Sequence, residues 1–239
     1  MGVKILGIAG SPRHGNTELA VKEALEGAAE LEGVETEFLT IAGADIRGGC
    51  TGCYRCTEAK KPHRKVLCLN PDINKDDVNE IFRRMIEADG WLVGVPVYFG
   101  SIPAQFKAII DRSMAVEYAN CAFRNKVAGA LVTAFDRNGG LEHTISHLQN
   151  WFLIHDMLPV SVGPERPREQ GGIGSYFGGT VLQGWPHPCM DEEREFDAVK
   201  DDYIGMRQVR FLGKRTAEMT LVVKAGFEHT KTVWPYRGL

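Results

Sequence analysis

The sequence has no excess of basic residues. Its 239 residues include 28 Lys and Arg against 31 Asp and Glu, and the formal net charge is −3. A protein that binds nucleic acid normally carries a basic surface that neutralises phosphates. We therefore expect no nucleic-acid partner.

Long apolar runs and targeting signals are also absent from the sequence. No stretch approaches the ~18 uninterrupted apolar residues that a membrane-spanning helix needs. The first residues run directly into a strand-like segment, without the basic region or the small-residue cleavage site of a secretory signal. We expect a cytoplasmic protein that makes no membrane contact.

Cysteine is scarce, and its distribution is uneven. Four of the six cysteines crowd into one segment and two stand alone: Cys50, Cys53, Cys56 and Cys68, then Cys121 and Cys189. A secreted disulfide scaffold would be shorter and would spread its cysteines along the chain. The clustering instead indicates metal binding or redox chemistry.

Apolar runs typical of buried strands alternate with segments of helical period. The predicted strands are Val3–Gly10, Val34–Thr40, Trp91–Val97, Lys126–Phe135 and Leu158–Val162. Predicted helices cover 17–31, a segment that starts at Asn74, a segment that starts at Pro103, and 141–157. Because parallel neighbours need crossover helices, the pattern predicts an α/β fold with a doubly wound five-stranded parallel sheet. The flavodoxin-like order 2-1-3-4-5 is the commonest for five such strands.

The sequence changes character after residue 162. Residues 1–162 are predicted as the flavodoxin-like domain, with a cysteine-rich insertion at 47–71. Residues 163–239 are predicted as a loop, a helix over about 191–223 and a polar tail, which we expect to take part in oligomer contacts.

A polar loop lies between the first strand and the first helix. Backbone N–H groups and the helix dipole favour an anion at such a junction. The dinucleotide glycine pattern is absent, and Asn16 stands where a nucleoside-triphosphate loop has lysine. Hydroxyl and amide donors suit a terminal monophosphate, such as that of FMN. The alternative is a helix cap without a ligand. The candidate residues are Ser11, Arg13, His14, Gly15, Asn16 and Thr17.

Two further loops follow the third and fourth strands. Their candidate residues are Pro96, Val97, Tyr98, Phe99, Gly100 and Ser101, and then Ala134, Phe135, Arg137, Gly139 and Gly140. Ligands of doubly wound sheets bind at the carboxyl ends of the strands. Aromatic rings beside glycine could therefore enclose a flat flavin ring. The alternative is that Tyr98 and Phe99 are core aromatics.

Three of the clustered cysteines are spaced as in a bacterial ferredoxin. Cys50, Cys53 and Cys56 form a C-x2-C-x2-C run, which suits a 4Fe–4S cluster with Cys68 as the fourth ligand. Zinc sites more often pair two C-x-x-C knuckles, but zinc or no metal stays open. The insert before Cys68 is basic, with Lys60, Lys61, His63, Arg64 and Lys65; it is either a solvated loop or a docking site for an acidic ferredoxin.

Together these motifs resemble the NADPH-dependent FMN reductase branch of the flavodoxin-like superfamily. The motifs are SPR-x-x-GNT, P-x-Y-F-G-S-x-P-A and a glycine pair after the fourth strand. By that resemblance, Ser11, Arg13, Asn16 and Thr17 hold the FMN phosphate, and 96–101 and 134–140 enclose the ring. With the cysteines added, the sequence resembles the iron–sulfur flavoproteins, although its last cysteine spacing is longer than theirs.

The second resemblance implies an FMN-dependent oxidoreductase with a 4Fe–4S cluster. Its donor would be reduced ferredoxin or a similar one-electron carrier, with NAD(P)H as the alternative donor. It also implies a homo-oligomer, a dimer or tetramer, in which the cluster of one subunit approaches the flavin of another. Because the cofactors carry the chemistry, no catalytic acid or base is nominated. Two other functions stay open: a cluster-free NAD(P)H-dependent FMN or quinone reductase, and a non-enzymatic metal-binding or redox-sensing module.

Overall fold

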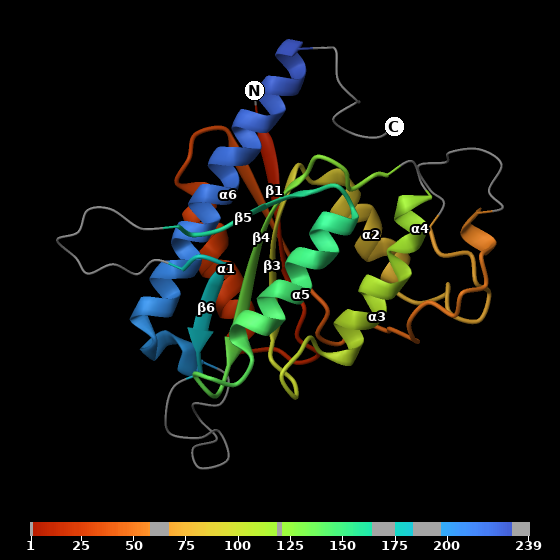
Figure 1. Ribbon diagram of the computed structural model, residues 1–239, viewed down its shortest axis with the longest axis horizontal. Coiled ribbons are helices and arrows are strands. Elements are labelled where there is room, and N and C mark those ends of the chain that lie inside the picture. The colour runs from red at the N-terminus through yellow and green to blue at the C-terminus, as the bar shows by residue number, and fades with distance from the viewer. Residues whose placement is uncertain (1, 58–66, 119–120, 164–174, 184–196, 231–239) are drawn as a thin grey trace.

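The computed structural model describes residues 2–57, 67–118, 121–163, 175–183 and 197–230. Its centre is a parallel sheet with the order β2-β1-β3-β4-β5 (Figure 1). The strands are β1 (Val3–Ala9), β2 (Val34–Thr40), β3 (Gly90–Pro96), β4 (Val127–Ala134) and β5 (Leu158–Val160). This order and the parallel pairing confirm the predicted flavodoxin-like α/β fold.

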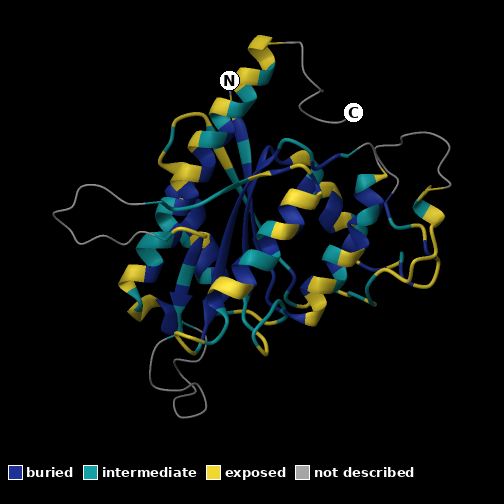
Figure 2. Ribbon diagram, in the orientation of Figure 1, coloured by how far each residue is buried: buried dark blue, intermediate teal, exposed yellow. Residues whose placement is uncertain are grey.

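Helices cover both faces of the sheet, as a parallel sheet requires. They are α1 (Asn16–Ala29), α2 (Val78–Glu87), α3 (Ala104–Arg112), α4 (Met114–Glu117), α5 (Leu141–Ile154) and α6 (Tyr203–Thr230). One core cluster joins the sheet to α2, α3 and α5, and a second joins it to α1 and α6. The central strands are accordingly buried throughout (Figure 2). None of the helices described is both long and apolar enough to cross a membrane.

A sixth strand, β6 (Gly179–Leu182), completes the edge of the sheet. Strand β5 pairs with the first part of β4, from Val127 to Gly129, and β6 pairs with the last part, from Leu131 to Ala134. The sequence does not predict β6, because its four residues begin with glycine and form no recognisable apolar run. Its end is held by Asp202, whose Oδ2 accepts the Leu182 N–H at 2.7 Å.

The C-terminal helix packs directly on α1. A Cβ at Gly213 would lie 1.7 Å from the Ala24 carbonyl oxygen, and one at Gly27 would lie 2.0 Å from the Arg210 carbonyl oxygen. The two backbones can approach this closely only because both positions are glycine. Helix α6 starts at residue 203 and continues to 230, later at both ends than predicted, so the residues predicted as the start of the tail are helical. Whether residues 1–162 fold as a separate domain stays a prediction.

Helix α2 starts at Val78 and not at Asn74, so the predicted helix start is wrong. Residues 71–77 form turns, in which the Ile73 and Asn74 N–H groups both donate to the Asn70 carbonyl. The two aspartates just before α2 also contact distant residues. Asp77 accepts the Asp45 N–H, and Asp76 pairs with Arg112. Long-range contacts thus decide where this helix begins.

Candidate functional site

The loop after β1 is a compact polar turn at the carboxyl edge of the sheet. Ser11 is buried, and its Oγ donates to the Arg13 carbonyl at 2.7 Å and accepts the Arg13 N–H at 3.2 Å. Gly15 has φ 129° and directly precedes α1. The first N–H groups of a helix have no partner within it, so this turn presents donors to an anion.

Thr17 connects this loop to the neighbouring candidate loop. Its Oγ1 lies 2.8 Å from the Thr133 Oγ1 near the end of β4, and both side chains are buried. The β3 and β4 loops also meet, because a Cβ on Gly140 would lie 2.9 Å from the Gly100 Cα. The structure therefore brings the three predicted loops together at one edge.

His14 and Asn16 each have a partner within the protein. The His14 Nδ1 lies 2.8 Å from the Glu18 Oε1, which also accepts the Thr40 hydroxyl at 2.6 Å. Burial opposes charge on Glu18, but these hydrogen bonds outweigh it and hold the pKa of Glu18 below its ordinary value. The buried Asn16 accepts the Val199 N–H on its Oδ1 at 3.1 Å. The loop before α1 is thus fixed from the C-terminal part of the chain.

The loop after β3 is a tight turn that exposes its aromatic residues. The N–H of Tyr98 donates to the Ser101 carbonyl at 2.9 Å, and the N–H of Ser101 donates to the Tyr98 carbonyl at 3.1 Å. Phe99 and Gly100 have φ values of 48° and 78°, as in a type I′ turn. Phe99 is fully exposed and Tyr98 is 41% exposed, so the interpretation of these two residues as core aromatics is wrong. A left-handed, exposed phenylalanine is uncommon and is typical of a functional loop.

The loop after β4 borders a pocket of about 570 Å³. Arg137, Asn138 and Gly140 line it on one side, and Asp202 and Gln208 line it on the other. Ala134 is buried at the strand end, whereas Arg137 is exposed. The contribution of α6 could not be predicted, because Gln208 is distant in the chain and resembles an ordinary polar helix residue.

The four clustered cysteines lie around a second, smaller pocket. Cys50, Cys53, Cys56 and Cys68 all line it, together with apolar side chains such as Ile73. The Gly52 N–H donates to the Cys50 Sγ at 3.4 Å. Burial raises the pKa of the Cys56 thiol, and the neighbouring cysteines raise it further. The basic insert between Cys56 and Cys68 lies outside the described residues.

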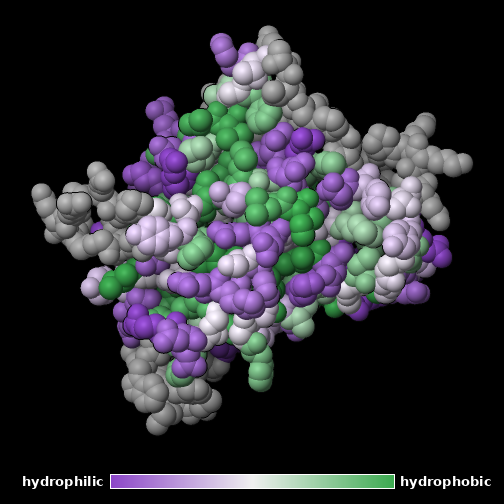
Figure 3. All heavy atoms as spheres, viewed as in Figure 1, coloured by the Kyte–Doolittle hydropathy of each residue, from purple (hydrophilic) through white to green (hydrophobic). Residues whose placement is uncertain are grey.

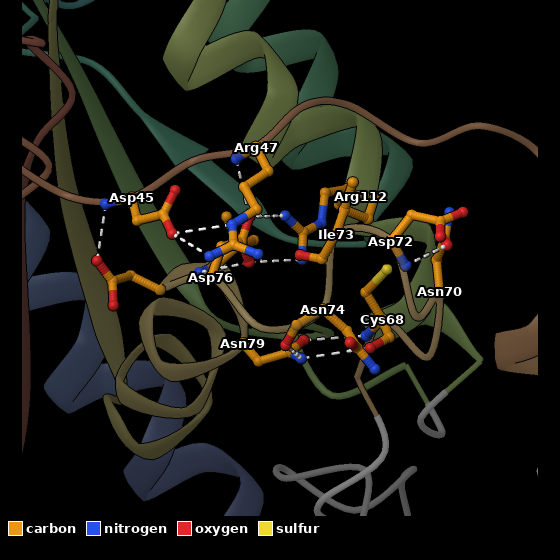
Figure 4. A network of polar contacts seen from close by, with 12 residues as sticks. Asp45, Arg47, Cys68, Asn70, Asp72, Ile73, Asn74, Asp76, Asn79 and Arg112 are labelled. Atoms are coloured by element: carbon orange, nitrogen blue, oxygen red, sulfur yellow. Dashed lines mark hydrogen bonds and ion pairs between the residues drawn. The ribbon is translucent and has the colours of Figure 1, made fainter.

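Three polar side chains from residues 70–79 hold the cysteine loop in place (Figure 4). Asn79 accepts the Cys68 N–H at 3.0 Å and donates to the Cys68 carbonyl at 3.3 Å. The Asn70 amide donates to the Thr51 hydroxyl at 3.0 Å, next to Cys50. The third side chain, Asp76, accepts the Arg47 N–H at 3.0 Å. None of the three was predicted from the sequence, in which the available signal was the cluster of Asn and Asp just after Cys68.

Asp76 is itself fixed by a buried ion pair with Arg112 at the end of α3. Both side chains are fully buried, and the two guanidinium Nη atoms reach the two carboxylate oxygens. Burial opposes charge on Asp76, but Arg112 and the Arg47 N–H outweigh it and hold the pKa of Asp76 below its ordinary value. The carboxylate is therefore ionised at neutral pH, and breaking this buried pair would be costly.

Among the described residues, no three His, Cys, Asp or Glu side chains are arranged to hold one metal ion. The five described cysteines are all free of disulfides. The four cysteines of the pocket are thus free thiols that line one shared space.

Known proteins resemble this chain over most of its length. An iron–sulfur flavoprotein of Methanocaldococcus jannaschii is 42% identical over 223 residues, which cover 93% of this chain and 100% of the relative. An iron–sulfur flavoprotein of Methanosarcina thermophila is 33% identical over 223 residues, covering 93% and 97%. In structure, a WrbA-like flavodoxin from Agrobacterium tumefaciens has a TM-score of 0.58 at 16% identity, covering 92% of this chain and 99% of that one.

The profile of the NADPH-dependent FMN reductase family matches residues 3–163, which contain all three candidate flavin loops and the four clustered cysteines. A solved NADH:FMN oxidoreductase shares the fold, with a TM-score of 0.52 at 16% identity and coverage of 91% and 89%. The interpretation as a non-enzymatic module does not agree with this membership. The chain belongs to the iron–sulfur flavoproteins of the NADPH-dependent FMN reductase family and is an FMN-dependent oxidoreductase.

Proposed function

We propose that the protein is an electron-transfer flavoprotein that carries FMN and a 4Fe–4S cluster and accepts electrons from reduced ferredoxin. The cluster ligands are Cys50, Cys53, Cys56 and Cys68. The observation that carries this proposal is that all four cysteines line one pocket, although Cys68 is separated from the others in the sequence. The relatives named iron–sulfur flavoproteins support it.

The arrangement of the cysteines favours a cluster over zinc. A zinc ion needs four ligands about 2.3 Å from one point when all are thiolates. The run of Cys50, Cys53 and Cys56 instead has the C-x2-C-x2-C spacing of a bacterial ferredoxin, and the paired C-x-x-C knuckles of a zinc site are absent from the sequence. A 4Fe–4S cluster binds each thiolate at a separate iron, so its ligands surround a larger volume. The four thiols that line one pocket would supply one ligand for each iron. Thiols free of disulfides persist in a reducing compartment, which favours the cytoplasm.

The FMN site is assigned to the three loops that meet at the carboxyl edge of the sheet. We assign the phosphate to Ser11, Arg13, His14, Gly15, Asn16 and Thr17. The ring is assigned to 96–101 and to Ala134, Phe135, Arg137, Gly139 and Gly140. The donor-rich turn before α1 suits a phosphate, and the contact between Gly100 and Gly140 supports a common wall for the ring.

When both are bound, FMN can exchange two electrons and the cluster exchanges one at a time, which joins two-electron to one-electron chemistry. The residues of the chain bind and orient the two groups. Asn70, Asp76 and Asn79 hold the cysteine loop, and Thr17 connects the phosphate loop to β4. No side chain needs to transfer a proton for this role.

A homo-oligomer, a dimer or tetramer, is part of the proposal. Leu153 and Ile154 at the end of α5 are 56% and 75% exposed, and apolar atoms gather over α5 in Figure 3. Beside them is a largely apolar pocket of about 470 Å³ between α3, α4 and α5. Exposed apolar patches of this kind are typical of protein–protein contacts.

The choice of electron donor tests this function. Anaerobic protein should show flavin bleaching when reduced ferredoxin is mixed with it in a stopped-flow spectrometer, and NADPH or NADH alone should act much more slowly. Rapid bleaching by NADPH in protein without iron would contradict the proposal. It would establish the alternative, a cluster-free NAD(P)H-dependent FMN or quinone reductase.

A further inference from the structure

Arg112 is a buried cation that lines the four-cysteine pocket. It is the last residue of α3 and is 1% exposed. Its side chain lines the same pocket as Cys50, Cys53, Cys56 and Cys68. An arginine so fully buried is unusual unless all its donors have partners.

Two of the three guanidinium nitrogens have partners (Figure 4). Nη1 and Nη2 donate to the two oxygens of Asp76, and Nη2 also donates to the Ile73 carbonyl at 3.2 Å. Because the guanidinium is planar, this two-point contact also fixes the direction of Nε. Asp76 in turn accepts the N–H groups of Arg47 and Val78, so it is held independently of Arg112.

The third nitrogen, Nε, is buried and has no hydrogen-bond partner among the residues that the structure describes. A buried donor of a charged group costs free energy when it is left without an acceptor. Such a group in a native structure needs an explanation, and an ion or ligand that accepts the bond is one. The pocket that Arg112 shares with the four cysteines is where such an acceptor would lie.

We propose that Arg112 is a tuning residue of the cluster: its Nε donates an N–H···S hydrogen bond to a sulfur of the cluster or of its ligands. This inference rests on the proposed function, since it requires the cluster. The potentials of iron–sulfur clusters depend on net charge, on hydrogen bonds to sulfur and on solvent exposure. Reduction adds one electron. Because Asp76 offsets the positive charge of Arg112, the N–H bond is what stabilises the added charge. Arg112 therefore raises the reduction potential.

Arg112→Lys tests this inference, because lysine keeps a cation opposite Asp76 but has no equivalent of the fixed Nε–H. The matched control is Arg84→Lys, which makes the same change in a guanidinium that pairs with Glu37 and does not line the cysteine pocket. After anaerobic reconstitution, the reduced and oxidised cluster populations are measured by electron paramagnetic resonance in a redox titration. At one fixed potential, the ratio of reduced to oxidised cluster should fall about tenfold in Arg112→Lys, as expected for one charge-assisted hydrogen bond. It should be unchanged in Arg84→Lys.

Arg112→Lys is checked for folding by circular dichroism. If it does not fold, the double variant Arg112→Gln/Asp76→Asn replaces the pair with neutral side chains and avoids an unpaired buried carboxylate. In this double variant, the ratio of reduced to oxidised cluster should fall by the same factor. Independently of any variant, wild-type protein labelled with ¹⁵N-arginine should show ¹⁵N coupling to the reduced cluster by electron–nuclear double resonance.

The outcomes separate this inference from the proposed function. Three results would overturn the role of Arg112 and leave the cluster in place. The ratio of reduced to oxidised cluster could be unchanged in the Arg112 variants, or it could fall equally in Arg84→Lys. The third such result is that the wild type shows no arginine coupling. Wild-type protein that assembles no cluster would overturn the proposed function and this inference with it.

Discussion

Replacing Cys53 with Ala should remove the cluster and leave FMN bound. The wild type should contain about four irons per chain after anaerobic reconstitution, and the variant should lose most of them, since three remaining thiolates leave one iron exposed. Cys53 is exposed, so its loss should change the free energy of unfolding little. The cysteine loop and the phosphate loop are separate segments, so flavin content should stay at the wild-type level. Iron, sulfide and flavin are measured on the same samples.

Cys121→Ala is the matched control for this variant. Cys121 does not line the four-cysteine pocket. Its thiol instead donates to the Glu117 carboxylate at 3.3 Å. It should keep the full iron complement. Full iron in Cys53→Ala would show that Cys53 is not a ligand. The same assay on Cys68→Ala tests the fourth ligand.

Changing Asn16 to Asp should weaken FMN binding much more than riboflavin binding. The aspartate would place a negative charge beside a phosphate that carries about −1.5 to −2 at neutral pH. Like charges a few ångströms apart in a partly desolvated site should cost about 2–4 kcal/mol, or about 30- to 1,000-fold in affinity. Riboflavin has no phosphate and should lose little. The two dissociation constants are measured for both proteins by fluorescence titration.

The structure makes this substitution a clean test of charge. Asn16 uses its Oδ1 to accept the Val199 N–H, and an aspartate oxygen can accept the same bond. Aspartate is also favourable in the first turn of a helix. Asn150→Asp, on α5, adds the same charge away from the phosphate loop and should leave both affinities unchanged. Equal weakening of FMN and riboflavin by Asn16→Asp would show that the phosphate binds elsewhere.

The sheet was predictable because its strands are local patterns. The strands β1, β3 and β4 are apolar runs buried on both faces, and their order follows from alternation with helices. Strand β6 escaped prediction because its position depends on the partner β4, and not on its own four residues. The predicted start of α2 was wrong for a similar reason, since Asp76 forms an ion pair with Arg112, which is distant in the sequence.

The candidate site was predictable where the chemistry is local. The cysteine spacing and the polar loop before α1 could be identified in the sequence, and the structure brings each group together. The contacts that hold them are long-range: Asn16 and Val199 are 183 positions apart, and Arg112 and Asp76 are 36 apart. A single sequence contains no signal that pairs such residues. The side chains that orient the ligands were therefore missed.

Iron and acid-labile sulfide per FMN, with the visible spectrum of anaerobically purified and reconstituted protein, test the central claim most directly. The account predicts about four irons and about four sulfides per chain, and a broad cysteinyl-cluster absorption beneath the flavin bands. A clean flavin spectrum with negligible iron and sulfide after reconstitution would contradict it.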